Sequence, residues 1–247
     1  MRRLSLPAAL ITVLAACLPA SLSPPAAGAG AGYRLESVSL PDGSARVARW
    51  NPCQSAITYK VNVRGIRGKR AKRSAVRVTK ASVARVVRAT GLPLAYAGRT
   101  RAVPRRSNLA GQRAAELVIA FVRPAQTDLP LGGRAAAYGG WQASYARTAR
   151  GDYSVAITRG HVVVDHPQTR RWRNGIHRRG ITRANLISHE LGHAIGLEHV
   201  HNRSQLMNAS ILRTSPAGYG EGDRRGLYRV GRAAGCVTGD WNARDLS

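Results

Sequence analysis

The sequence predicts an α+β fold, and three patterns along its 247 residues support this prediction. Residues 57–63 alternate between apolar and polar side chains, as a half-buried strand does. A basic segment, residues 64–80, then runs into a helical spacing of valines between Val76 and Val87. Residues 189–199 read His-Glu-Leu-Gly-His-Ala-Ile-Gly-Leu-Glu-His, which places two histidines four residues apart on one face of a second helix.

The middle of the chain predicts further strands separated by glycine-rich turns. The first helix ends at Gly91-Leu92-Pro93, because glycine and proline both interrupt helices. Residues 117–122 form a short apolar strand. Residues 153–158 and 161–165 are predicted as a pair of strands joined through Arg159-Gly160. Turns are predicted at Leu131-Gly132-Gly133 and at Gly139-Gly140.

Two helices are predicted in the C-terminal part of the chain. Thr182 is suited to cap a helix over residues 183–197, since its hydroxyl can accept a hydrogen bond from a free backbone amide. Asp223 is suited to cap a final helix that carries Leu227, Tyr228 and Val230, and its charge also favours the start of a helix.

The histidine-rich segment predicts a catalytic zinc site. His189 and His193 project from the same helix face and can bind one ion. Gly196 allows a left-handed turn, which brings His199 round as a third ligand. Three protein ligands with one open position are typical of catalytic zinc, whereas structural zinc usually has four. Glu190 lies beside the first ligand, within reach of a bound water. The competing interpretation, a surface helix with solvated histidines, leaves the five matched positions unexplained.

A methionine downstream connects this motif to a family. Met207 follows His199 by eight residues, in Gln-Leu-Met-Asn-Ala-Ser. The histidine motif followed by a methionine turn resembles the metzincins, and the Leu-Met pair at this distance resembles the matrixins among them. Ala209 stands where astacin-like members carry a tyrosine ligand, and Val200 stands where vertebrate matrixins usually carry serine or threonine. The chain therefore resembles a divergent, bacterial branch of the matrixins.

The resemblance implies a fold and an activity. The expected fold is a twisted, mainly parallel sheet with an antiparallel edge strand, a long zinc-binding helix, a methionine turn and a C-terminal helix. The expected activity is that of a zinc-dependent endopeptidase, in which Glu190 is the general base for a zinc-activated water. Met207 is expected to pack beneath the single catalytic Zn²⁺ rather than bind it. An edge strand near residues 135–141 is expected to pair with an extended protein or peptide substrate.

A second metal site has weaker support. The acidic, histidine-bearing loop that holds structural zinc and calcium in mammalian matrixins is not found. His161 and Asp165 lie near its place, but Val162, Val163 and Val164 between them are predicted as strand core. Calcium remains possible without support from any pattern. Glu198, just before the third ligand, either orients a ligand or is a solvated surface charge.

Composition and charge limit the classes of binding partner that we expect. The chain is 44% hydrophobic, which is enough for one sizeable domain, and we expect a monomer. Its net charge is +27, which favours anionic partners such as cell-wall polymers, although abundant arginine also fits a coding bias. The basic segment at residues 64–77 has no aromatic side chains for base stacking, so we expect no specific nucleic-acid binding. Two alternatives remain: a zinc hydrolase acting on cell-wall peptides, and a non-enzymatic, exported basic binding protein.

The N-terminus predicts export. Arg2 and Arg3 precede an apolar stretch, residues 4–18, which is short for a membrane span, and small residues follow. We therefore divide the chain into a signal peptide at residues 1–31, a short linker at 32–48 and a catalytic domain at 49–247. The expected product is secreted. The alternative is a protein that is lipid-anchored at the cell surface through Cys17, because Leu-Ala-Ala-Cys also resembles a lipoprotein signal.

Export in turn predicts a disulfide. Without Cys17, the domain retains Cys53 and Cys236, an even number in an oxidising compartment. A bridge between them would tie the first strand to the end of the last helix. The alternative is two free, buried thiols.

Overall fold

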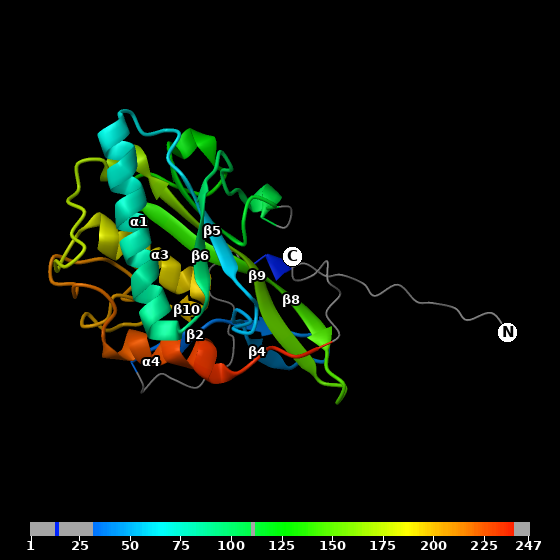
Figure 1. The fold of residues 1–247 in the computed structure, drawn as a ribbon. Helices are drawn as coiled ribbons and strands as arrows, with labels where there is room; N and C mark the ends of the chain where they lie inside the picture. Colours follow the sequence, from blue (N-terminus) through cyan, green and yellow to red (C-terminus); the bar gives the residue numbers. More distant parts are fainter. Residues whose placement is uncertain (1–12, 15–31, 110–111, 240–247) are drawn as a thin grey trace.

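The computed structural model describes residues 13–14, 32–109 and 112–239 (Figure 1). Its centre is a sheet with five longer strands in the order β8-β9-β7-β5-β6, and the two-residue strand β1 (Val13–Leu14) pairs with the outer side of β8. The pairs β5–β6, β5–β7 and β7–β9 are parallel, and β8 pairs antiparallel with β9. This confirms the predicted mainly parallel sheet with an antiparallel edge strand. The strands are β5 (Ile57–Asn62), β6 (Leu94–Arg99), β7 (Leu117–Val122), β8 (Ala137–Arg147) and β9 (Tyr153–Asp165).

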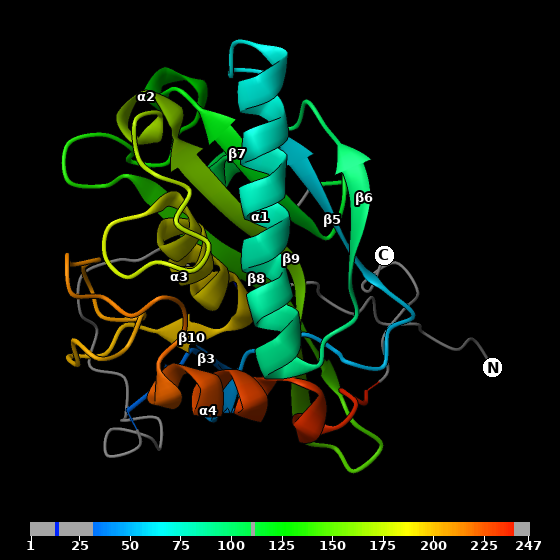
Figure 2. The same cartoon turned by 60° about the vertical axis from the view of Figure 1, so that its left-hand side comes forward.

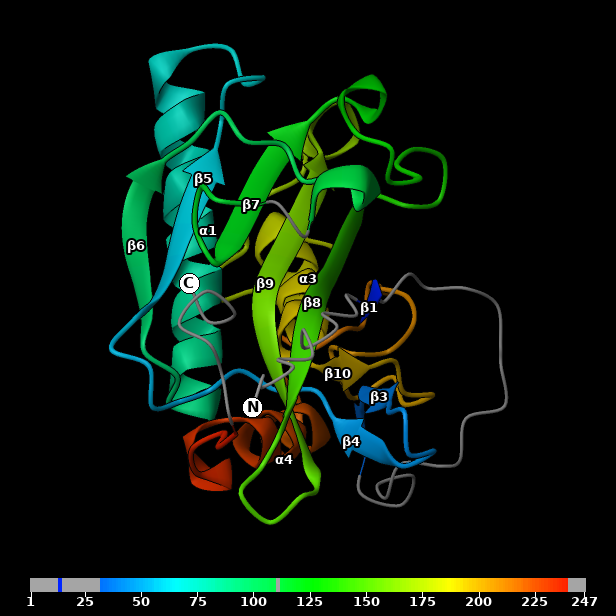
Figure 3. The ribbon, with the colours of Figure 1, turned by 90° about the vertical axis from the view of Figure 1, so that its right-hand side faces the viewer.

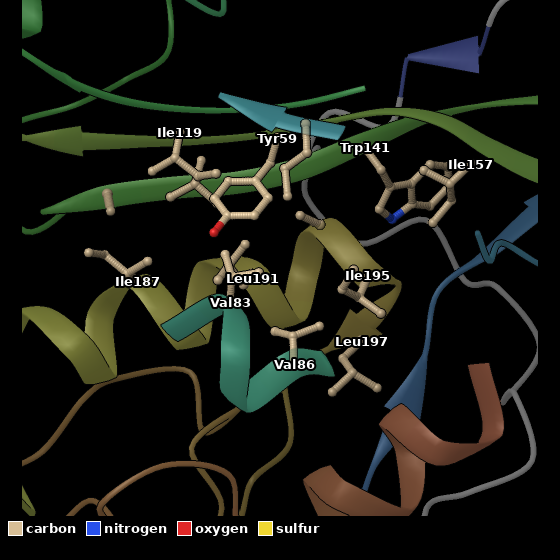
Figure 4. Packing of buried hydrophobic residues seen from close by; sticks show 14 of the residues in the cluster. Tyr59, Val83, Val86, Ile119, Trp141, Ile157, Ile187, Leu191, Ile195 and Leu197 are labelled. Atoms are coloured by element: carbon tan, nitrogen blue, oxygen red, sulfur yellow. The ribbon is translucent and has the colours of Figure 1, made fainter. Parts of the chain in front are cut away.

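Two long helices cover one face of this sheet. α1 (Lys69–Thr90) and α3 (Arg183–Ile195) lie side by side on that face, and α4 (Glu221–Val230) lies across the C-terminal end of α1 (Figure 2). Ile119 and Tyr59 of the sheet lie above Leu191 of α3 and Val83 of α1, and Ile157 lies above Ile195 of α3 (Figure 4). The main core therefore lies between the sheet and the two helices. A four-residue helix α2 (His166–Thr169) and three 3₁₀ turns, η1 (Arg106–Asn108), η2 (Pro124–Gln126) and η3 (Arg232–Ala234), complete the helical elements of the described residues.

A smaller core lies on the other face of the sheet. It contains Val118, Ala120 and Val163, all fully buried, with Leu129 from the connection after β7. Alternation along the strands explains the division, since Ile119 and Val162 face the helices while their neighbours face away. A strand buried on both faces is apolar throughout, as residues 117–122 are.

Two of the glycine-based turn predictions were wrong. Gly139-Gly140 lies inside β8, and Gly160 lies inside β9, which runs unbroken from Tyr153 to Asp165. These glycines provide room instead of turns. A Cβ on Gly139 would lie 2.0 Å from the backbone oxygen of Glu190, and one on Gly160 would lie 3.1 Å from the Trp50 ring. A sequence pattern cannot distinguish these two uses of glycine.

The helix ends follow their predicted signals, with one exception. The Thr182 hydroxyl accepts a hydrogen bond from the Asn185 amide at 3.1 Å and caps α3. Gly91 ends α1 and Gly196 ends α3, both in the left-handed conformation that glycine tolerates. Asp223 is not the N-cap of α4, because that position is Gly220.

The segment at residues 32–48 packs onto the domain. Its strand β2 (Arg34–Leu35) pairs antiparallel with β10 (Leu197–Glu198), next to the third histidine of the motif. Strands β3 (Ser37–Ser39) and β4 (Ala45–Val47) form a hairpin after it, and Leu35, Val38 and Leu40 are buried. The division into signal peptide, linker and domain remains a prediction. Within residues 1–31 the structure describes only the two-residue strand β1 (Val13–Leu14), beside the edge of β8 (Figure 3), so Cys17 lies outside the described residues.

The structure contains the predicted disulfide. Cys53 and Cys236 are bonded across a sequence separation of 183 residues. The segment around Cys236 also accepts hydrogen bonds from the Arg49 guanidinium, at 2.6 Å to the Gly235 oxygen and 3.1 Å to the Cys236 oxygen. The C-terminal segment is thereby fastened to the chain just before β5. None of the helices in the described part of the chain is long and apolar enough to cross a membrane.

Candidate metal centre

Three histidines converge at the C-terminal half of α3. His189 and His193 lie four residues apart on the helix, and His199 follows β10 after the turn at Gly196. One ring nitrogen from each lies within 4.8 Å of the others. The Nε2 atom of His199 is 3.0 Å from the Nε2 atoms of both His189 and His193. The structure thus brings together the three residues that the sequence motif predicted as ligands.

Hydrogen bonds on the far side of two rings fix their orientation. The Nδ1 atom of His189 lies 2.7 Å from the Leu206 oxygen, and that of His193 lies 2.8 Å from the Leu197 oxygen. Carbonyl oxygens only accept, so each Nδ1 carries the proton and donates it. Each Nε2 then directs a lone pair toward the shared centre.

This arrangement fits a bound cation. With His189 and His193 protonated on Nδ1, the Nε2 of His199 faces two lone pairs and can donate a proton to only one of them. A metal ion at the centre accepts all three lone pairs at once, and three imidazoles are a common zinc donor set. Burial and the neighbouring rings hold the pKa of His189 well below its ordinary value, and burial lowers that of His199 to about 4. Both rings are therefore kept in the neutral form that binds metal.

The turn after α3 depends on glycine in two ways. Gly196 has a φ of 106°, and a Cβ there would lie 2.6 Å from the Ala48 oxygen. The left-handed turn reverses the chain so that His199 faces the two helical histidines. Val200 then donates its backbone amide to the Met207 oxygen at 2.9 Å, which ties the third ligand to the methionine turn.

The methionine turn packs directly against the ligand helix. Met207 is 1% exposed, and a Cβ on Gly192 would lie 2.3 Å from its sulfur. Gly192 immediately precedes His193 on the helix, so Met207 lies against the helix where the ligands project. Met207 is thus a buried residue that packs against α3, and its expected place beneath a zinc ion stays a prediction.

Asp223 holds this turn in position, a role that its helix-cap interpretation did not anticipate. Its buried carboxylate accepts hydrogen bonds from the amides of Leu206 at 2.6 Å, Met207 at 3.4 Å and Gly220 at 2.9 Å. Burial raises the pKa of Asp223, and these hydrogen bonds oppose the rise. No local sequence pattern indicated these contacts with the methionine turn, because they join residues 16 and 17 positions apart.

Glu190 lies buried beside the edge strand. Its residue is 7% exposed, and the close approach of Gly139 brings β8 against the backbone of α3 at this point. Burial raises the pKa of Glu190, while the electrostatic effect of the His193 imidazole and a hydrogen bond from the Gly139 amide oppose the rise. The carboxylate therefore lies next to the histidines, on the side of the helix that faces β8.

Two more carboxylates lie near the centre, and sequence reasoning missed one of them. Glu198 pairs with Arg34 at 2.8 Å, so it is a partly exposed ion-paired residue. Glu36, from the segment predicted as a linker, lies 3.5 Å from the Nδ1 atom of His193. Burial lowers the pKa of His193, but Glu36 and Glu190 outweigh this effect, and the net shift is upward. No sequence motif marks Glu36, because its position depends on the pairing of β2 with β10.

His161 and Asp165, the two residues considered for a second metal, lie in the buried sheet and at the start of α2. His161 is 4% exposed and belongs to the same sheet face as Val163, away from α3. Burial lowers its pKa to about 4. Asp165 caps α2 by accepting a hydrogen bond from the Gln168 amide at 3.0 Å. The valines between them, Val162 to Val164, are fully buried, which confirms the prediction of strand core.

A comparison with known protein families agrees with this arrangement of histidines. Residues 112–229 match the family model described as matrixin. Comparison with curated proteins gave no significant match. The matched range begins before β7 and ends in α4, so it includes the three histidines, Glu190, the methionine turn and Asp223. Strand β5, helix α1 and the N-terminal strand β2 lie outside it.

Proposed function

Because this chain is a matrixin-like metzincin with a three-histidine centre, we propose that it is a secreted zinc-dependent endopeptidase with Glu190 as its general base. The observation that supports this most directly is the convergence of three Nε2 atoms beside a buried carboxylate. Three ligands leave one coordination position for water or substrate, which is the arrangement of catalytic zinc.

The residues at the centre have separate tasks in this proposal. His189, His193 and His199 would hold one zinc ion, which would supply a Lewis acid able to acidify water and polarise a carbonyl group. The Glu190 carboxylate takes a proton from the attacking water and gives it to the leaving amine. Burial raises the pKa of Glu190 above that of a free glutamate, which makes the carboxylate a stronger base for the first transfer, the uptake of a proton from water.

The edge strand supports a peptide as the substrate. β8 is the outermost of the five longer strands of the sheet and passes over α3 at Glu190. An edge strand offers unpaired backbone groups to which an extended peptide can add as a further strand. The two-residue strand β1 pairs antiparallel with Gln142 and Ala143 of β8, so this edge accommodates an extended chain (Figure 3).

The disulfide supports an extracellular location. Disulfides persist in oxidising compartments, and Cys53 and Cys236 are bonded. The basic surface also suits contact with an anionic polymer of the cell wall. The start of α1 carries the exposed Lys69, Arg70 and Arg73 and the partly buried Lys72. A hydrolase of cell-wall peptides is therefore the second candidate function.

Bound zinc and hydrolysis should be measured together on the purified, processed protein. The comparison is between wild type, Glu190→Ala and Glu221→Ala, where Glu221 is a surface carboxylate with a 74% exposed side chain. We expect about one zinc per chain in all three, since Glu190 is not a ligand. We expect casein cleavage in wild type and Glu221→Ala, at least 100-fold less in Glu190→Ala, and none after chelation.

Other outcomes would change the proposal in defined ways. Zinc without casein cleavage in wild type would move the assignment to the cell-wall hydrolase, which release of peptides from peptidoglycan would then test. A protein without zinc would contradict the catalytic proposal and favour the non-enzymatic basic binding protein. Undiminished cleavage by Glu190→Ala would remove Glu190 from the mechanism.

A further inference from the structure

The N-terminal strand joins the metal centre through its backbone. Leu35 of β2 is paired with Leu197, and Arg34 is paired with Glu198, immediately before the ligand His199 (Figure 1). The amide of Glu36 donates to the Gly196 oxygen at 2.8 Å. The segment therefore lies along the whole turn that connects the second ligand to the third.

Packing fixes this segment at both ends. Leu35 is buried at 8% exposure, and the Glu36 oxygen accepts a hydrogen bond from the Ala48 amide at 3.0 Å. Before the strand, the Tyr33 side chain packs against Gly226 of α4, where an added Cβ would lie 3.0 Å from it. The position of Glu36 is consequently set by the fold and does not depend on a mobile loop.

The side chain of Glu36 points at the back of a metal ligand. Its Oε1 atom lies 3.5 Å from the Nδ1 atom of His193, whose proton also contacts the Leu197 oxygen at 2.8 Å. Glu36 is shielded, with a 20% exposed side chain, and His193 is 12% exposed. The nearby Arg34 is paired with Glu198 rather than with Glu36. The charge of Glu36 therefore acts on His193 with little screening from water.

We propose that Glu36 is a positioning residue, delivered by the N-terminal strand, that orients His193 and strengthens its binding of zinc. A carboxylate behind a metal-bound imidazole fixes the ring and makes its other nitrogen a better donor. This inference rests on the zinc site of the proposed function. It also implies that β2 and Glu36 are part of the metal centre, so the processed protein must retain them.

The test measures zinc affinity apart from activity. Wild type, Glu36→Gln and Glu36→Ala are compared by chelator competition, and the thermal midpoint of each metal-free protein is recorded. Glu221→Gln is the matched control, because it removes one negative charge at a side chain that is 74% exposed. Glu36→Gln keeps the size and the acceptor oxygen, so it separates loss of charge from loss of packing.

The expected result is a graded loss of zinc affinity. Glu36→Ala should weaken zinc binding by roughly 10–100-fold, and Glu36→Gln should weaken it less but by at least about threefold. Glu221→Gln should match wild type. The thermal midpoint of the metal-free Glu36→Gln protein should stay within about 2 °C of wild type, because its packing is unchanged.

Two results would overturn the inference. Zinc affinities of both Glu36 variants within twofold of wild type would show that the strand contributes only backbone contacts. Glu36 would instead have a structural role if Glu36→Gln bound zinc as tightly as wild type and if Glu36→Ala lost zinc affinity only together with a lower thermal midpoint of the metal-free protein. If wild type bound no zinc, the proposed function would fail together with the inference. If wild type bound zinc and the Glu36 variants bound it with the same affinity, the inference would fail while the proposed function would stand.

Discussion

Replacing Gly139 with alanine should displace the edge strand from the ligand helix. A Cβ at Gly139 would lie 2.0 Å from the backbone oxygen, 2.6 Å from the carbonyl carbon and 2.8 Å from the Cα atom of Glu190. Carbon and oxygen atoms in contact normally lie about 3.5 Å apart. The strand and the helix must therefore separate by more than about 1 Å at this point. The atoms in the way belong to the helix backbone, so no side-chain rotation can relieve the clash.

The size of the effect follows from this geometry. Overpacking costs about 1–3 kcal/mol, and we expect about 3 kcal/mol because both elements are held rigidly. β8 is paired with β9 along its whole length from Ala137 to Arg147, and α3 is almost completely buried. The shift also moves the Gly139 amide away from the Glu190 carboxylate to which it donates. Misplacing a catalytic group by about 1 Å costs on the order of 100-fold in rate.

The assay combines urea unfolding with hydrolysis of casein by the zinc-loaded protein. Gly65→Ala is the control, because the nearest atom to its new Cβ would be the Phe121 oxygen at 3.3 Å, a contact that a small adjustment relieves. We expect Gly65→Ala to lose less than about 1 kcal/mol and to keep its activity. Wild-type stability and activity in Gly139→Ala would refute the close contact between β8 and α3.

Two further predictions concern stability. Reducing the disulfide, or changing both Cys53 and Cys236 to serine, should lower the free energy of unfolding by up to about 5 kcal/mol. The reason is that the bond joins residues 183 positions apart and so closes a long loop. An unchanged urea midpoint on reduction would argue against the bond. His161 has its pKa lowered by burial from 6.5 to about 4, so the folded ring stays neutral while the unfolded chain takes up a proton. The neutral ring therefore contributes roughly 3 kcal/mol to the free energy of unfolding above pH 6.5, and this contribution is lost as the pH falls toward about 4. The slope of stability against pH should flatten over this range in His161→Leu, and an equal slope in both proteins would contradict the burial of a neutral ring.

Sequence reasoning succeeded where a signal is local. The spacing of His189 and His193 lies within one helical turn, and the capping role of Thr182 spans three residues, so both can be inferred without knowing the fold. The unbroken apolar run at residues 117–122 likewise indicates a buried strand by itself. The mainly parallel sheet with its antiparallel edge strand was instead expected from the resemblance, and the order of the strands was not predicted, since strand order depends on pairing that no short pattern records.

The failures involve contacts between distant segments. Gly139 and Gly160 were interpreted as turns because glycine is common there, but each provides room for another element. The roles of Asp223 at the methionine turn and Glu36 behind His193 depend on segments that fold back on α3. In the sequence, a carboxylate that supports a metal centre cannot be distinguished from a solvated surface carboxylate. Only the packing of the folded chain distinguishes the two.

The burial of α3 explains why these distant contacts matter for chemistry. Eleven of its 13 residues are buried, so the helix that carries His189 and His193 has almost no free surface. The sheet fixes one side and α1 another, while the methionine turn, β8 and β2 contact the part near the histidines. Leu35, Trp141 and Met207, one from each of the last three segments, belong to the same buried core as α3. Changes in β8, the methionine turn or β2 should therefore alter the metal centre and the stability of the fold together.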